Sequence, residues 1–178
     1  MTGVMKVVGV LGLLLSGGLA GPVRADEDPW GDFRFLIGAW VNEGKPGEAS
    51  GGFTLEPDLG GKVLVRRNRA EVPAAPGRPA GTHEDLMVIF REPGAQQVRA
   101  SYFDNEGHVI RYAVAPRPGK AGLSFVSDPA PSGPRFRLTY TPGGDDTVAV
   151  KFEVAPPGQP DGFRTYLEGS ARRKKPGP

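Results

Sequence analysis

Hydrophobic and polar residues alternate with a period of two along most of this chain. In residues 135–141 (RFRLTYT), Phe136, Leu138 and Tyr140 fall on one face and polar residues on the other. Such alternation, in runs rich in β-branched and aromatic residues, is typical of strands with one buried face. Ten segments fit this description: 35–44, 49–57, 62–72, 84–92, 97–104, 108–115, 122–128, 135–141, 147–155 and 163–173. No helical period extends over a helical length, so we expect at most a short turn near residues 28–35.

The segments between these runs are rich in turn-forming residues. Glycine (27 copies) and proline (19 copies) gather in stretches such as 116–122 (PRPGKAG) and 141–146 (TPGGDD). Consecutive strands with short connections favour an antiparallel meander, and closing ten strands into a barrel removes two exposed edges. We therefore predict an all-β fold, an antiparallel meander closed into a barrel of about ten strands that is wide enough to enclose a cavity. A two-sheet β-sandwich is the alternative.

The first 25 residues have the organisation of a secretory signal peptide. Lys6 precedes an apolar run, small residues follow, and cleavage is expected after Ala25. The apolar run is shorter than the roughly 20 residues of a membrane span. We divide the chain into a signal peptide (1–25), a single barrel domain (26–173) and a basic disordered tail (174–178), and we expect a periplasmic or extracellular protein.

Charge and cysteine content narrow the function classes. Cleavage would remove Lys6 and Arg24 from the 22 basic residues and no acidic ones, leaving 20 basic against 20 acidic residues. A formally neutral mature chain with a short basic tail does not indicate nucleic-acid binding. The chain has no cysteine, so disulfides and thiol chemistry are excluded and the fold depends on its hydrophobic core.

The segment FLIGAWVNEG (35–44), with Gly38 and Trp40 in the first strand of a continuous meander, resembles the calycin group of β-barrels. That group includes lipocalins, fatty-acid-binding proteins and nitrobindin-like haem barrels. The chain is also similar to small exported bacterial proteins of unknown function. In the calycin group the tryptophan closes one barrel end and an arginine of the last strand lies over its ring. Arg172 or Arg173 has the corresponding position, and we assign Gly38, Trp40 and Arg172 as the barrel-closing residues.

A second part of the resemblance concerns the ligand. Fatty-acid-binding proteins hold the ligand carboxylate with an Arg-x-Tyr pair late in the chain, and Arg164 and Tyr166 are similar to that pair. The resemblance therefore implies that these two residues bind a ligand.

Arginines within the strands supply further candidates. By parity, Arg67 and Arg69 share a face with Val63 and Val65, whereas Arg66 falls on the other face with Leu64. One interpretation places arginines at the barrel mouth, where a guanidinium would bind an acidic head group. The other places them outside, paired with acidic residues such as Glu71 and Glu84 across strands. The candidate ligand-binding residues are Arg67, Arg69, Arg111, Arg164 and Tyr166.

No motif of a known catalytic class occurs, so we incline to a protein that is not an enzyme. The pair His83–Glu84 sits where neighbouring side chains point to opposite faces of a strand, which disfavours joint metal ligation. We expect no metal and no cofactor. Haem is disfavoured because no histidine follows His108.

We interpret the protein as an exported, monomeric β-barrel that binds a small apolar or amphipathic ligand, with an acidic lipid-like molecule as the expected type. The alternative is a periplasmic structural or interaction protein with a filled barrel. A haem-binding or hydrolytic enzyme comes third.

Overall fold

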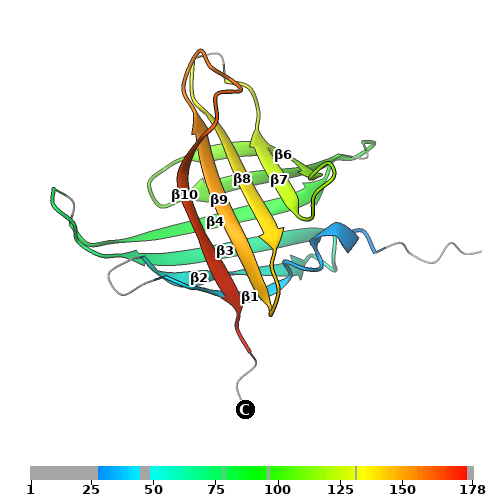
Figure 1. Ribbon diagram of the computed structural model, residues 1–178. Helices are drawn as coiled ribbons and strands as arrows, with labels where there is room; N and C mark the ends of the chain where they lie inside the picture. Colours follow the sequence, from blue (N-terminus) through cyan, green and yellow to red (C-terminus); the bar gives the residue numbers. More distant parts are fainter. Residues whose placement is uncertain (1–27, 45–48, 78, 96, 131, 176–178) are drawn as a thin grey trace, which may run out of the picture.

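The structure, a computed structural model, describes residues 28–44, 49–77, 79–95, 97–130 and 132–175 (Figure 1). The expected signal peptide and the last three residues of the expected tail lie outside this part of the chain. Export therefore stays a prediction. Within the described residues, no helix combines the length and the hydrophobicity needed to cross a membrane.

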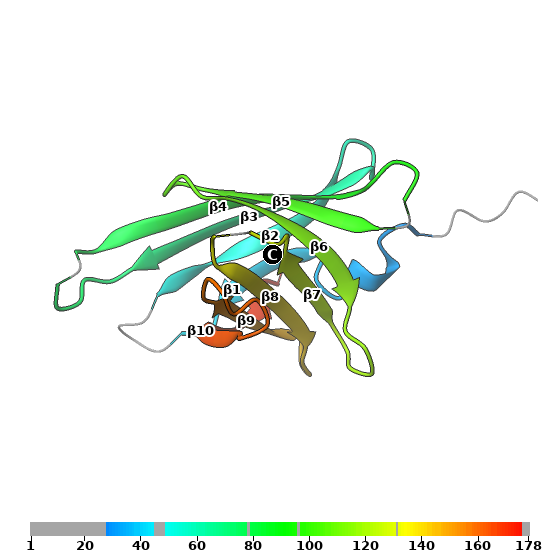
Figure 2. The ribbon, with the colours of Figure 1, turned by 90° about the horizontal axis from the view of Figure 1, so that it is seen from above.

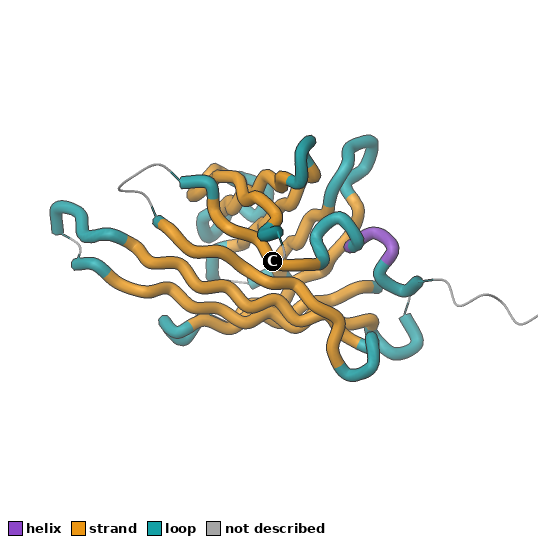
Figure 3. The backbone as a smooth tube through the Cα atoms, turned by 90° about the horizontal axis from the view of Figure 1, so that it is seen from below, coloured by secondary structure: helices purple, strands orange, loops and turns teal. Residues whose placement is uncertain are grey.

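Ten antiparallel strands follow one another around a closed barrel. They are β1 (Gly38–Asn42), β2 (Ser50–Asp58), β3 (Val63–Val72), β4 (Gly81–Arg91), β5 (Val98–Asp104), β6 (Val109–Pro116), β7 (Leu123–Ser127), β8 (Arg135–Pro142), β9 (Thr147–Ala155) and β10 (Arg164–Arg173). A 3-10 turn, η1 (Gly31–Phe33), is the one helical segment among the described residues and is drawn purple in Figure 3.

Pairing between the first and last strands closes the barrel. Trp40 of β1 lies opposite Arg173 of β10, and Val41 lies opposite Arg172. The predicted all-β barrel is confirmed, and a sandwich of two separate sheets is excluded. The strands are strongly tilted: β2 to β5 lie on one side and β7 to β10 cross them on the other (Figures 1 and 2).

One end of the barrel is closed by aromatic and aliphatic side chains. Trp30, Phe33 and Leu36, from η1 and its flanks, are each less than 5% exposed. The indole Nε1 of Trp30 donates to the carbonyl oxygen of Gly61, in the β2–β3 turn, at 2.8 Å. Phe33 meets the ring of Phe125 edge-on at 6.4 Å. The segment that precedes β1 therefore forms the floor of the barrel.

Candidate functional site

Trp40 belongs to the closed end and is 3% exposed. The guanidinium carbon of Arg173 lies 4.4 Å from the centre of its ring. Arg173 also donates to the carbonyl oxygens of Ile37 at 2.6 Å and Phe35 at 2.9 Å. The indole Nε1 of Trp40 donates to the carbonyl oxygen of Leu36 at 2.8 Å. These contacts hold the first strand against the last, and the role of Trp40 is therefore structural.

Of the two late arginines, Arg173 and not Arg172 lies over Trp40. Alternation along β10 turns Arg172 outward, where its Nε donates to Glu43 at 2.7 Å. Gly38 makes room for the stacked arginine: it has φ +129°, and a Cβ there would lie 2.6 Å from Nη1 of Arg173. The assignment of Arg172 as a barrel-closing residue is therefore corrected to Arg173.

Three of the predicted ligand-binding arginines lie on the outer surface. Arg67, Arg69 and Arg111 are exposed, and their strand neighbours face the core. Arg69 forms ion pairs with Glu71 and Glu84, as the exterior interpretation of these arginines predicted. None of the three reaches the barrel interior.

The other two predicted residues lie at the open end. We call this end, formed by the turn 104–108 and by residues 163–167, the mouth. Arg164 pairs with Val154 on the inner face of the sheet but is exposed beyond the rim. A bulge between residues 165 and 167 turns Tyr166 outward, so that it is 76% exposed and meets Phe152 edge-on at 6.1 Å. They lie at the entrance to the barrel and not within it.

The arginine that does enter the barrel is Arg66, which is 9% exposed. Its Nη1 donates to Asp85, also 9% exposed, from the adjacent strand β4. Asn68 donates to the second oxygen of Asp85 at 2.9 Å. The guanidinium carbon lies 5.0 Å from the ring centre of Phe53. Burial alone would lower the pKa of Arg66, but interactions with its neighbours, the Asp85 carboxylate among them, outweigh burial and leave it raised, so the guanidinium stays charged.

Two polar atoms in this region have no hydrogen bond of standard geometry among the described residues, although the guanidinium of Arg66 lies close enough to the Tyr140 hydroxyl to interact with it. They are Nε of Arg66 and the hydroxyl of Tyr140, whose residue is fully buried. Burial raises the pKa of Tyr140, so its hydroxyl stays protonated and remains a donor. Buried donors without partners are rare in folded proteins because each forfeits its hydration. Because the Arg66 guanidinium lies within reach of the Tyr140 oxygen, the donor left over is the hydroxyl hydrogen of Tyr140.

Polar side chains connect this layer to the mouth, beginning with Nε2 of His83, which lies 3.4 Å from Asp85. The Tyr102 hydroxyl donates to Asp104 at 3.1 Å and lies 3.3 Å from Nε2 of His83. Burial raises the pKa of Tyr102. Burial would also raise the pKa of Asp104, but hydrogen bonds from His108 and Tyr102 hold it below its usual value. The contact between Nδ1 of His108 and Asp104, 2.9 Å long, raises the pKa of His108.

Apolar side chains form the opposite wall between Tyr140 and the mouth. Phe136 of β8 and Phe152 of β9 stack at 5.9 Å, and Leu138 lies between Phe136 and Tyr140 on the inner face. Leu167 pairs with Phe152 and so faces inward, yet it is 54% exposed. Leu167 is therefore the part of this wall that is open to solvent at the mouth.

The inner layer is balanced in charge. Arg66 is paired with Asp85, and Asp104 is paired with His108 when the imidazole is protonated. The described residues hold no cluster of three or more metal-ligating side chains.

No protein-family model matches the sequence, and no curated protein matches it. The function must therefore be inferred from the geometry of this layer.

The sequence did not single out Arg66 as a binding residue. Parity separates it from Arg67 and Arg69, but both faces of β3 carry apolar residues: Leu64 on one, Val63 and Val65 on the other. The usable signal lay one strand further on. Asp85 stands among the apolar residues Met87 and Ile89 on one face of β4, and a buried carboxylate requires a buried cation.

Proposed function

We propose that this protein is a calycin-like barrel that binds a small amphipathic molecule. The ligand's polar end would accept a hydrogen bond from the hydroxyl of Tyr140, beside the guanidinium of Arg66. Its apolar part would lie along Leu138, Phe152 and Leu167 toward the mouth. The observation that carries the proposal is the buried Tyr140 hydroxyl, which has no acceptor among the described residues and lies beside the buried cation of Arg66. Burial of apolar ligand surface would supply most of the affinity, at about 25 cal/mol per Å².

The charge of the inner layer favours a neutral polar end over an acidic one. A ligand carboxylate near Arg66 would share that cation with Asp85 and would be repelled by Asp85 itself. A neutral carbonyl or ether oxygen accepts the same hydrogen bond without adding a second negative charge. The proposal therefore departs from the acidic lipid that the strand arginines suggested.

A pair of fluorescent probes tests the proposal. Dansyl-labelled undecanoic acid and its methyl ester have the same apolar body and differ in the charge of the polar end. We expect dansyl emission to rise on binding and the ester to bind at least as tightly as the acid. If the acid binds much more tightly, the neutral polar end is refuted but the barrel site is not. If neither probe binds, the alternative of a filled barrel with a surface function is supported instead.

Variants locate the site. Tyr140→Phe keeps the ring and removes one donor, so the Kd of the ester should rise about fivefold. The double variant R66M/D85L removes the arginine without leaving a buried charge and should raise the Kd about tenfold or more. Arg67→Met, one residue along β3 but outside the barrel, is the matched control and should leave the Kd unchanged. Equal affinities in all four proteins would refute the assignment of Arg66 and Tyr140.

A further inference from the structure

The outer face of β8, β9 and β10 carries a groove of about 730 Å³ that is separate from the barrel interior. Its floor follows the strand register: Ser124, Thr139, Lys151 and Glu168 form one row across β7 to β10. The β6–β7 turn forms one side, with Arg117 and Lys120. None of the residues that line this groove is aromatic.

Among the described residues, those that line this groove carry more positive than negative charge. Four cations line it (Arg117, Lys120, Arg137 and Lys151) against two carboxylates (Glu153 and Glu168). Lys120 has no ion-pair partner among the described residues, and Arg117 donates to a hydroxyl and a carbonyl oxygen and not to a carboxylate.

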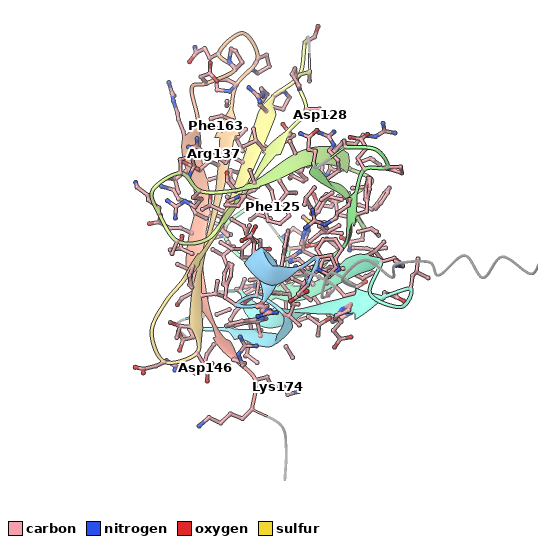
Figure 4. All side chains as sticks on the ribbon, turned by 90° about the vertical axis from the view of Figure 1, so that its right-hand side faces the viewer. Phe125, Asp128, Arg137, Asp146, Phe163 and Lys174 are labelled. Atoms are coloured by element: carbon pink, nitrogen blue, oxygen red, sulfur yellow. The ribbon has the colours of Figure 1, made fainter. Side chains whose placement is uncertain are left out.

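One ion pair fixes one end of the groove. Arg137 binds Glu153 through two hydrogen bonds of 2.6 and 2.9 Å. The other face of its guanidinium covers Phe163, 4.3 Å from the ring centre, and the two side chains lie together in Figure 4. Lys151 lies 3.8 Å from the same Glu153, whose oxygens Arg137 already occupies. The cations without a carboxylate partner among the described residues are therefore Arg117 and Lys120, and Lys151 lies near them on the floor of the groove.

We propose that this groove binds an anionic saccharide segment. Ser124, Thr139 and Thr141 offer hydroxyl groups along the floor, which suit the hydroxyls of a sugar chain, and Arg117 and Lys120 suit its carboxylate or sulfate groups, with Lys151 nearby. The cations come from the β6–β7 turn (Arg117 and Lys120) and from β9 (Lys151), so a ligand that spans the groove can meet both. A nucleotide base would find no aromatic ring here to stack on.

Calorimetric titration with three defined sugars tests this site. We expect tetragalacturonate or a sulfated disaccharide to bind, with an affinity that falls as salt is added. Maltotetraose, which is neutral, should give no heat of binding. The two anionic sugars separate the carboxylate from the sulfate as the recognised group. Failure of both to bind would overturn the proposal, and so would equal binding of maltotetraose.

Matched variants place the binding on the groove. K120Q/K151Q removes two charges and should weaken binding of the anionic sugar about tenfold or more. Thr139→Val keeps the shape of the floor but not its hydroxyl, and a loss of about threefold to fivefold is expected. R67Q/R111Q removes the same charge from the outer face of β3 and β6 and should change little. If it weakens binding as much as K120Q/K151Q, binding follows net charge and the groove assignment is wrong. Because the groove lies outside the barrel, the dansyl ester should bind K120Q/K151Q normally whether or not the sugar binds.

Discussion

Exchanging Asp85 for leucine leaves the guanidinium of Arg66 inside the barrel without its counter-charge. Both residues are 9% exposed, so little water reaches the position of the lost partner. Removing one member of a buried ion pair costs about 3–5 kcal/mol of unfolding free energy. Asp85→Leu also removes the acceptor of Asn68, which adds about 1 kcal/mol. We expect D85L to lose about 4–6 kcal/mol.

The reciprocal variant, Arg66→Met, leaves the carboxylate of Asp85 buried. This carboxylate keeps the hydrogen bond from Asn68, and Nε2 of His83 lies 3.4 Å away, so the cost should fall to about 3 kcal/mol. In R66M/D85L both charges are gone and apolar side chains fill the layer. The double variant should therefore lie within about 2 kcal/mol of the wild type. The coupling between the two substitutions would exceed about 3 kcal/mol.

Urea unfolding of the four proteins, followed by tryptophan fluorescence, gives this coupling directly. A domain of this size has only about 5–15 kcal/mol of stability, so D85L can unfold altogether. The cycle still decides the matter, because the double variant must then be more stable than D85L. Effects that add within about 0.5 kcal/mol would refute the buried pair, and so would a double variant less stable than both single ones.

Three further predictions concern the closed end and the mouth. Gly38→Ala should lower the unfolding free energy by about 1–3 kcal/mol in thermal melts, because of its positive φ and the close approach of Arg173; Gly169→Ala, where a Cβ meets nothing within 4 Å, is the control and should change little. Arg173→Gln should cost about 2 kcal/mol in urea unfolding, because it loses the Trp40 ring and two carbonyl acceptors, whereas the outward Arg172→Gln should cost less than about 1 kcal/mol; equal losses would contradict the stacking. The hydrogen bond between His108 and Asp104 should stabilise the protein below the ordinary histidine pKa of 6.5 and lose that effect as the pH rises through the raised pKa of His108. It should also be lost as the pH falls from the ordinary aspartate pKa of 3.8 through the lowered pKa of Asp104. His108→Gln should flatten the upper part of this profile in stability measurements across pH, and an unchanged profile would show that the contact does not form.

Most of the fold could be predicted because alternation is a local signal. All ten predicted strands occur, and β8 lies within one residue of its predicted bounds. The prediction for β4 began three residues late, since Thr82 and His83 continue the pairing with β3 through Ala70 and Glu71. The bulge in β10 could not be predicted, because it depends on how the last strand fits against β9.

The candidate site was harder to predict from the sequence than the fold, because alternation defines the two faces of a strand and does not say which face lies inside the barrel. On β3 the exterior Val65 is 7% exposed and the interior Arg66 is 9% exposed, so neither hydrophobicity nor burial separates the two faces. The inside is set by the neighbours across the sheet: Leu55 and Met87 flank Arg66 in register and are fully buried. This information resides in the pairing of strands and not in any one segment.

The same alternation keeps the two proposed sites apart although they share a strand. Tyr140 of β8 points into the barrel, while Thr139 and Thr141, its neighbours in sequence, line the outer groove. A ligand of either site therefore contacts β8 without contacting the residues of the other. The charges follow the same division, because the inner arginine has its own carboxylate whereas the groove has cations to spare. The sheet alone thus separates the inner layer around Tyr140, which suits a neutral acceptor, from the outer groove, which suits an anion. A shift of one residue in the register of β8 would exchange its two faces.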